Sequence, residues 1–284
     1  MDCGGGCPST CAVGIGCKVA ADCTSGFCDG TLCVATQCED KVQSTGELGV
    51  DCGGPCPICP VSNLGVTLHL DAADPASFPG SGSTWTDLSG GGNHAAIGTY
   101  TLSTDFGGGI EVNGSSITVP AADTWSMNPA TASNTIEIWW RKGTISGHGG
   151  QMIGTYPANG GTWQIFQNAE GYSATEPTAS MIWANGNTPQ YWWSGSTHAL
   201  DEVALMTVVQ VGQQFDYYGN GAFVSSQTRA SFAESGSRPM TLGCNTSGTE
   251  CGKMTFFVVR WYDRALTPSE IDLNFQAQRA RFGL

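Results

Sequence analysis

Cleavage of a glycan requires carboxylates that act together, and the sequence gives little sign of such a pair. Two acids spaced two residues apart on one strand would face the same cleft. In the strands predicted here, Glu137 is followed two positions later by Trp139, and Glu111 by Asn113. The four histidines are scattered, and no HExxH, GxSxG or GxxxxGK[ST] motif occurs. We therefore predict a non-enzymatic protein, with a glycan-active hydrolase built from carboxylates of different strands as a weaker alternative.

Aromatic residues near a loop give the clearest indication of a binding site. Tyr191, Trp192 and Trp193 follow the turn-forming residues Asn187-Thr188-Pro189, and a flat aromatic ring can stack on the apolar face of a sugar. On a strand, Tyr191 and Trp193 would lie on one face and Trp192 on the other. These three residues are our candidate glycan site. The alternative is that at least one of the tryptophans belongs to the core, where large aromatic side chains are usually found.

Cysteine is concentrated at the start of the chain. Eleven of the thirteen cysteines lie within residues 1–60, a density typical of a disulfide scaffold in an oxidising compartment. A segment with so few aliphatic side chains cannot bury enough apolar surface to fold without crosslinks. We therefore predict disulfides in this segment. Two alternatives are disfavoured: a zinc site, because paired CxxC spacing is missing, and redox activity of Cys56-Pro57-Ile58-Cys59, because no βαβ pattern surrounds it.

The cysteines belong to an internal repeat. The motif DCGGGCPSTC at residues 2–11 returns as DCGGPCPIC at residues 51–59. It resembles Cys-rich repeats ending in VDCGG.CP.C that occur in multidomain surface proteins of bacteria and protists. The first copy lacks a counterpart of Cys38, and residues 1–20 show no signal peptide. We therefore expect further repeats and an export signal upstream of Met1. Near the other end of the chain, Cys244 and Cys251 are expected to close a loop with a disulfide.

Charge and hydropathy restrict the partners. The net charge is −13 and no basic stripe occurs, so nucleic-acid binding is not expected. No apolar run is long enough to cross a bilayer, so direct membrane insertion is not expected either. The acidity is explained by solubility, although a cation site or a salty medium would also account for it. Together with the cysteines, these features indicate an extracellular protein, secreted or on a cell or virion surface.

Short strand-like runs separated by Gly, Asn and Ser fill the rest of the chain. Several alternate in period two, as in Thr135-Ile136-Glu137-Ile138-Trp139. This pattern predicts an all-β sandwich or jelly roll over residues 61–284, after a separate disulfide-rich domain at residues 1–60. Of Trp139 and Trp140, one ring is expected inside the sandwich and one outside. The side chains predicted to lie between the sheets are Ile136, Ile138, Trp163, Ile165, Met181, Leu205 and Val208.

One helix is predicted, at the C-terminus. Thr267 is a suitable N-cap, Pro268 suits the first helical position, and Glu270 completes a capping box. Arg279 and Arg281 fall in the last turn, where cations favour the helix dipole. Gly283 is expected to end the helix.

Segments of residues 61–284 carry a family resemblance. The run LHLDAAD at residues 68–74 is similar to the first strand of bacterial and viral laminin-G-like, concanavalin-like domains. WTDLSGGGNHA at residues 85–95 resembles their glycine-rich loop, and WYDRALT at residues 261–267 resembles their closing strand. The resemblance implies a concanavalin-like antiparallel jelly roll, an architecture that lectins share with glucanases.

The resemblance also implies a structural calcium ion near the glycine-rich loop. Asp87 and Asn93 match that loop, and Ca²⁺ is held by about 6–8 oxygen ligands. The alternative is that Asp87 and Asn93 shape the turn. Asn113 and Asn245 begin glycosylation sequons, which apply if the source is eukaryotic or infects eukaryotes.

We thus predict an extracellular recognition or adhesion module that binds a glycan or a partner protein through its β-sandwich. The main alternative is a structural subunit of an appendage, coat or virion fibre, which would self-assemble.

Overall fold

The computed structural model describes residues 10–45, 47, 49–52, 55–57, 59–127, 133–143, 149–155, 162–168, 179–185, 188–192, 198–228 and 237–284. The chain divides into two compact units. One comprises Met1–Ser62 and Asp272–Ala280, and the other comprises Asn63–Ile271 and Arg281–Leu284.

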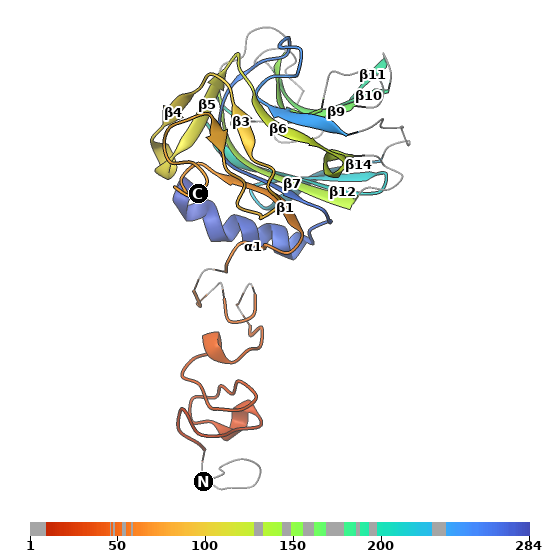
Figure 1. Ribbon diagram of the computed structural model, residues 1–284. Coiled ribbons are helices and arrows are strands. Elements are labelled where there is room, and N and C mark those ends of the chain that lie inside the picture. The colour runs from red at the N-terminus through yellow and green to blue at the C-terminus, as the bar shows by residue number, and fades with distance from the viewer. Residues whose placement is uncertain are drawn as a thin grey trace. The chain divides into compact units, whose positions relative to one another are not determined.

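The larger unit is built from two antiparallel sheets that lie face to face (Figure 1). The first, called the β7 sheet here, has the order β14-β13-β12-β7-β16-β5-β4, and β1 also pairs with β16. Its strands are β1 (Val66–Asp71), β4 (Thr101–Ser103), β5 (Gly109–Asn113), β7 (Ser133–Lys142), β12 (Val203–Val211), β13 (Gln214–Gly219), β14 (Ala222–Thr228) and β16 (Lys253–Tyr262).

The second, called the β9 sheet, has the order β11-β10-β9-β8-β15-β6-β3-β2. Its strands are β2 (Thr84–Trp85), β3 (Ala95–Ile97), β6 (Ile117–Ala122), β8 (Gly149–Gly154), β9 (Thr162–Asn168), β10 (Ala179–Asn185), β11 (Thr188–Trp192) and β15 (Arg238–Leu242). The predicted antiparallel β-sandwich is confirmed.

Helical structure is sparse, as the composition indicates. The helix α1 (Pro268–Arg279) begins directly after Thr267, as predicted. The Glu270 carboxylate accepts a hydrogen bond from the Thr267 backbone N–H (2.8 Å), and the Thr267 hydroxyl accepts one from the Glu270 N–H (3.3 Å). This reciprocal capping box fixes the start of the helix. Short 3-10 helices lie at Ala20–Asp22, Gln37–Glu39, Asp105–Gly107, Asp123–Trp125 and Ala280–Phe282.

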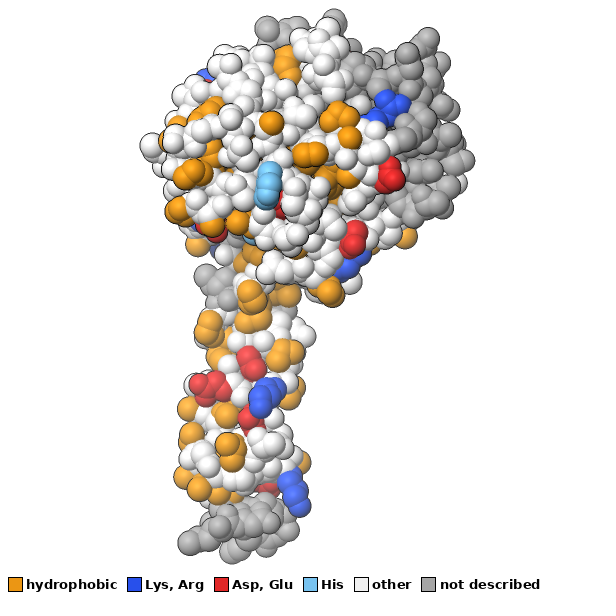
Figure 2. Space-filling model, in the orientation of Figure 1, with side chains coloured by type: hydrophobic (Ala, Val, Ile, Leu, Met, Phe, Trp, Pro, Cys, Tyr) orange, Lys and Arg blue, Asp and Glu red, His pale blue; other side chains and the backbone are white. Residues whose placement is uncertain are grey.

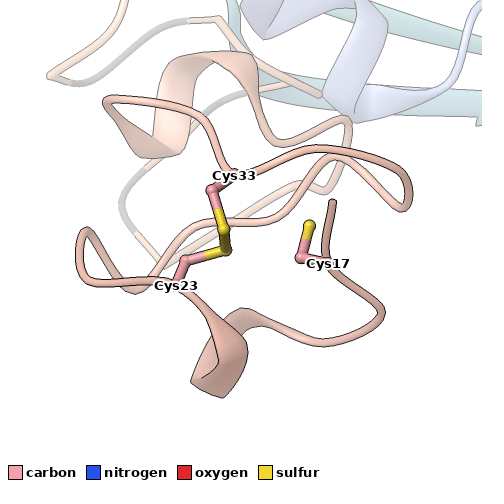
Figure 3. Close-up of side chains that lie close together, drawn as sticks. All are labelled: Cys17, Cys23 and Cys33. Carbon is pink, nitrogen blue, oxygen red and sulfur yellow. A yellow bond between two sulfur atoms is a disulfide. The ribbon is translucent and has the colours of Figure 1, made fainter. Parts of the chain in front are cut away.

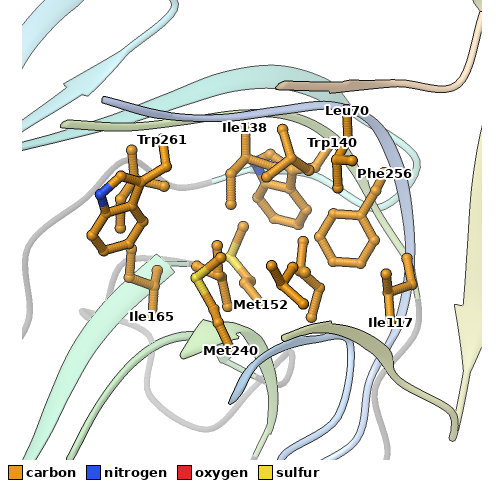
Figure 4. Close-up of a cluster of buried hydrophobic side chains, with 14 of the residues drawn as sticks. Leu70, Ile117, Ile138, Trp140, Met152, Ile165, Met240, Phe256 and Trp261 are labelled. Carbon is orange, nitrogen blue, oxygen red and sulfur yellow. The ribbon is translucent and has the colours of Figure 1, made fainter. Parts of the chain in front are cut away.

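The core lies between the two sheets and is rich in aromatic side chains. Figure 4 shows Ile138, Trp140 and Trp261 facing Met152, Ile165 and Met240. Of the predicted interior residues, Ile136, Ile138, Trp163, Ile165 and Val208 lie in this core. The side chain of Met181 is outside the described part of the structure.

Two neighbouring residues of the β7 sheet show how alternation divides its faces. Trp140 is buried in the core, whereas Trp139 stacks on Phe282 outside it, with ring centroids 4.0 Å apart. Leu205 pairs in register with Trp139. Leu205 is therefore buried on the outer face rather than between the sheets, because its neighbours Met206 and Val208 take the two core positions.

The smaller unit is held by disulfides. The described residues contain the pairs Cys17–Cys28, Cys23–Cys33, Cys38–Cys56 and Cys52–Cys59. Figure 3 shows the Cys23–Cys33 bond with the sulfur of Cys17 close by. The three sulfurs of Cys17, Cys23 and Cys33 lie within 4.8 Å of one another, as zinc ligands would. Each is consumed in a disulfide, however, and the predicted crosslinked segment is confirmed.

The pairing also argues against a redox-active CxxC. Cys56 is joined to Cys38 and Cys59 to Cys52, so the two cysteines of this motif are not bonded to each other. Each bond instead closes its own loop, which restricts the unfolded chain.

Candidate functional site

The predicted aromatic site falls on an edge strand. Tyr191 and Trp192 are the last two residues of β11, which pairs only with β10 among the described strands. Trp193 lies outside the described residues. The sequence placed these aromatics near a loop, and the structure places the first two in a strand that ends there.

The strand register relates these positions to the two faces of the β9 sheet. Tyr191 is opposite Ile182, which is opposite Gln164 in β9. Trp192 is aligned through Met181 with Ile165, a core residue. Position 191 is thus in line with the outward residue Gln164.

A disulfide-closed loop lies against this sheet. Cys244 and Cys251 are joined, and the backbone N–H of Gln151 in β8 donates to the carbonyl of Glu250 (3.1 Å). A Cβ added to Gly150 would lie 2.4 Å from the backbone nitrogen of Gly252. The loop therefore packs directly on β8, with no room for a side chain between them.

Amide side chains connect this loop to the sheet. Gln164 Nε2 and Asn245 Nδ2 both donate to Glu250 Oε2, each at 3.1 Å. Gln151 Nε2 donates to the hydroxyl of Thr241 (2.6 Å). Gln151, Gln164 and Asn245 are at most 2% exposed, whereas Glu250 is partly exposed. We call Gln151, Gln164, Thr241, Asn245 and Glu250 the amide cluster.

No motif in the sequence predicts the amide cluster. Gln164 stands between the core residues Trp163 and Ile165 of β9, and so points to the outer face of the sheet. This polar residue in an apolar run is the one local signal that indicates the cluster. Its partner Glu250 is 86 positions away in the chain, and only the folding of the loop onto β8 and β9 brings the two together.

The two glycosylation sequons differ in exposure. Asn113 ends β5 and is exposed. Asn245 is 2% exposed, and its amide donates to Thr249 Oγ1 (3.0 Å) and Glu250 Oε2 (3.1 Å). A glycan on the Asn245 nitrogen would displace these contacts, whereas the exposed side chain of Asn113 has no such obstacle.

Asp87 and Asn93 organise the early glycine-rich turn. Asp87 Oδ1 accepts the backbone N–H groups of His69 and Ser89, both at 2.9 Å. Asp87 Oδ2 accepts the hydroxyl of Ser89 (2.8 Å) and the N–H of Asn93 (3.0 Å). Asn93 Nδ2 donates to the carbonyl of Thr67 (2.9 Å). Four donors fill the acceptor positions of a carboxylate, so this geometry favours the turn-shaping role over calcium ligation.

The carboxylate of Glu137 is buried beside a cation. On the outer face of the β7 sheet, Glu137 and Arg260 are 0% and 2% exposed with an N–O separation of 3.7 Å, and the Tyr262 hydroxyl donates to Glu137 (3.2 Å). Burial and then the nearby Arg260 cation lower the pKa of His69 to about 4. The Glu137 carboxylate is removed from water by its pairing with Arg260, so it cannot act on a substrate that arrives from solvent.

A shallow open pocket of about 660 Å³ is lined by Asp71, Ala73, Asp74, Pro75, Phe106, Gly107 and Arg281. Arg281 Nη1 donates to both oxygens of Asp71 (3.0 and 2.9 Å), and its Nε donates to the carbonyl of Phe106 (2.8 Å). These contacts fix the C-terminal tail and commit Asp71 to a structural ion pair.

The fold and the sequence together define the family. A profile of the concanavalin A-like lectin/glucanases superfamily matches residues 111–272, more than half of the chain. The protein belongs to this superfamily. A search of curated proteins finds no match to the sequence.

Solved structures share the fold at low sequence identity. The binding domain of Paraclostridial Mosquitocidal Protein 1 is 16% identical, with a TM-score of 0.55 over 74% of this chain and 52% of that one. Domain 4 of an extracellular GH43 arabinanase from Geobacillus stearothermophilus, solved with arabinotriose, is 18% identical, with a TM-score of 0.55 over 75% of this chain and 98% of that one. A Trypanosoma rangeli sialidase complex is 15% identical, with a TM-score of 0.58 over 79% and 35%. This chain therefore spans about half of the first structure and about a third of the sialidase.

Surface charge and helix length bear on the remaining partners. On the face in view in Figure 2, Lys and Arg side chains are few and lie apart. Within the described residues, the helices are too short or too polar to cross a bilayer. The absence of nucleic-acid binding stays a prediction.

Proposed function

We propose that the sandwich is a non-catalytic recognition module that binds a glycan on the outer face of the β9 sheet, near the end of β11. The protein that carries it is extracellular, which the disulfides of the smaller unit support, because such bonds persist in oxidising compartments.

One observation carries the proposal. The similarity extends over 98% of the arabinanase domain that was solved with arabinotriose, but over only 35% of the sialidase. The arabinanase domain shows that a sandwich of this size can exist as a separate module associated with a carbohydrate. The register, which aligns position 191 with Gln164 and the amide cluster, supports a site at this face.

The non-catalytic character is supported by the state of the acids. Asp71 is paired with Arg281, and Glu137 is buried with Arg260. Neither is available as a general acid or a nucleophile, both of which must reach the scissile bond.

The test is a glycan array that includes arabino-oligosaccharides. We expect Tyr191→Ala and Trp193→Ala to weaken binding at least tenfold, because each removes a ring that can stack on a sugar. Trp192→Ala is expected to lower stability instead, since position 192 is in register with the core residue Ile165. Phe223→Ala, which removes an exposed ring on β14 of the other sheet, is the matched control. An array without any bound glycan would refute the proposal.

Self-assembly as a structural subunit is the second candidate, and β14 favours it. This strand is an edge of the β7 sheet within the described residues, has no charged residue, and exposes 57% of Phe223 and 40% of Val224. Natural edges are commonly blocked by charge or proline. Light scattering across a concentration series would detect oligomers. Val224→Lys places a charge on the exposed edge strand and should cause these oligomers to dissociate.

A further inference from the structure

The amide cluster holds one carboxylate in a fixed position at the surface. Glu250 Oε2 accepts two amide hydrogen bonds, from Gln164 and Asn245 (3.1 Å each). Asn245 Oδ1 in turn accepts the backbone N–H of Thr249 (3.0 Å), and the Cys244–Cys251 bond closes the loop. A group held by buried partners and a crosslink loses little entropy when it binds a ligand.

The cluster contains two buried amide oxygens that lack donors in the part of the chain that the structure describes. Within the described residues, the side-chain carbonyl oxygens Oε1 of Gln151 and Gln164 are buried without a hydrogen-bond partner, and the two residues are 0% and 1% exposed. Buried polar atoms of this kind are usually satisfied, so these two oxygens have room for a donor beside the partly exposed Glu250, such as a bound water or a ligand hydroxyl. The amide of Gln164 lies directly beside Glu250, because its nitrogen donates to that carboxylate.

The partly exposed carboxylate of Glu250 defines the chemistry of a ligand. A carboxylate accepts hydrogen bonds from hydroxyl groups, and such charge-assisted bonds are stronger than neutral ones. An anionic sugar would bring a like charge to Glu250, and juxtaposed like charges are costly. The site therefore fits an uncharged, hydroxyl-rich sugar and disfavours sialylated or sulfated ones.

We propose that Glu250, fixed by the Cys244–Cys251 loop, is the polar anchor of a neutral-sugar subsite on the outer face of the β9 sheet. This inference rests on the proposed glycan-binding function and names the residue and ligand class that it uses.

The experiment applies the disulfide-bonded chain of 284 residues to an array of neutral oligosaccharides (arabinan, xylan, mannan and glucan fragments) beside sialylated and sulfated ones. Wild type should bind neutral members and not anionic ones. Glu250→Gln keeps the side-chain shape and an acceptor for both amides, and should weaken binding at least tenfold. Glu111→Gln removes an acid of the β7 sheet that pairs with Lys253 (3.4 Å), and should change affinity less than twofold.

A second variant protects the test against misfolding. Cys244→Ser with Cys251→Ser leaves Glu250 intact but releases its loop, and should weaken binding while tryptophan fluorescence still reports a folded sandwich. Neutral-sugar binding that Glu250→Gln leaves unchanged, or equal binding of sialylated sugars, would overturn the subsite and leave the glycan-binding proposal standing. An empty array would refute both.

Discussion

Glu137 and Arg260 form an ion pair that is almost completely removed from water, at 0% and 2% exposure. The register extends the polar row across the β7 sheet, with His69 opposite Arg260 and Thr207 opposite Glu137. Buried charges are tolerated only with partners, so Glu137 and Arg260 depend on each other.

Replacing Glu137 with Gln should destabilise the sandwich by about 3–5 kcal/mol, because it leaves the buried Arg260 charge uncompensated. Urea unfolding followed by tryptophan fluorescence measures the change. Glu111→Gln is the control, because its pair with Lys253 is partly exposed and pairs of that kind contribute about 0–1 kcal/mol. Equal effects of the two variants would contradict the argument.

His69 should make stability depend on pH. Its pKa in the folded chain is about 4, below the ordinary 6.5, so the unfolded chain takes up the proton first as the pH falls. This contribution to stability is complete above about pH 6.5 and is lost between 6.5 and 4. Burial lowers the pKa of His198 as well, in the same direction. His69→Gln should flatten the curve of unfolding free energy against pH in this window, and a curve identical to wild type would exclude the effect.

Calcium should not stabilise the turn around Asp87. Both carboxylate oxygens are already occupied by donors, and a site filled at a hundred times its Kd would add about 2.7 kcal/mol. We expect the melting temperature to be the same in EDTA and in millimolar calcium. A rise with calcium that Asp87→Asn abolishes would restore the metal site.

At the scale of elements, helix α1 depends on its first turn. Glu270 bonds Thr267 and also pairs with Arg264 (2.5 Å). The hydrogen bond from Arg264 is the largest cause of the low pKa of Glu270, about 2. Leu266 and Ile271 flank this turn and pack with Tyr262 of β16. The cap therefore positions the helix start against the outer face of the β7 sheet.

Thr267→Ala should cost about 1 kcal/mol, because it removes the hydroxyl that caps the Glu270 N–H. Thr267→Ser keeps that hydroxyl and should behave like wild type in the same urea unfolding experiment. Loss of stability in both variants would point to packing rather than capping.

At the scale of the whole molecule, two different forces fold the two units. The sandwich buries a large aromatic and aliphatic core. The described part of the smaller unit instead has buried cysteines as its cluster. Crosslinks typically contribute about 2–4 kcal/mol each by restricting the unfolded chain.

Reduction should therefore unfold the smaller unit and spare most of the sandwich. All nine tryptophans follow residue 60, so tryptophan fluorescence reports the sandwich alone, and limited proteolysis reports residues 1–62. We expect a reducing agent to expose cleavage sites in residues 1–62 while the fluorescence midpoint changes little. Cys244→Ser with Cys251→Ser, left oxidised, separates the contribution of the sandwich disulfide. A smaller unit that stays protected after reduction would contradict this division.

Local patterns were sufficient to predict much of the fold. The alternation around Ile136 and Ile138 predicted a strand with one face in the core, and Thr267, Pro268 and Glu270 predicted the helix start. Both signals lie within a few residues, where backbone geometry determines which side chains share a face or can reach an amide.

The candidate site was only partly accessible to such reasoning. The sequence indicated Tyr191 and Trp192, but their alignment with Gln164 and Ile165 depends on the register of three strands. Leu205 and Val208 were both predicted to lie inside, but residues three apart on a strand face opposite sides, and the pairing of Leu205 with Trp139 places it outside the core.

The sequence by itself therefore determined the sandwich, its C-terminal helix and the crosslinked segment, because period, capping and cysteine density are local or compositional. Only the tertiary structure decided that Asp87 is saturated by donors, that Asn245 is buried, and that Gln164 meets Glu250. Such contacts join residues from separate strands and loops, and sheet pairing across long stretches of chain sets them.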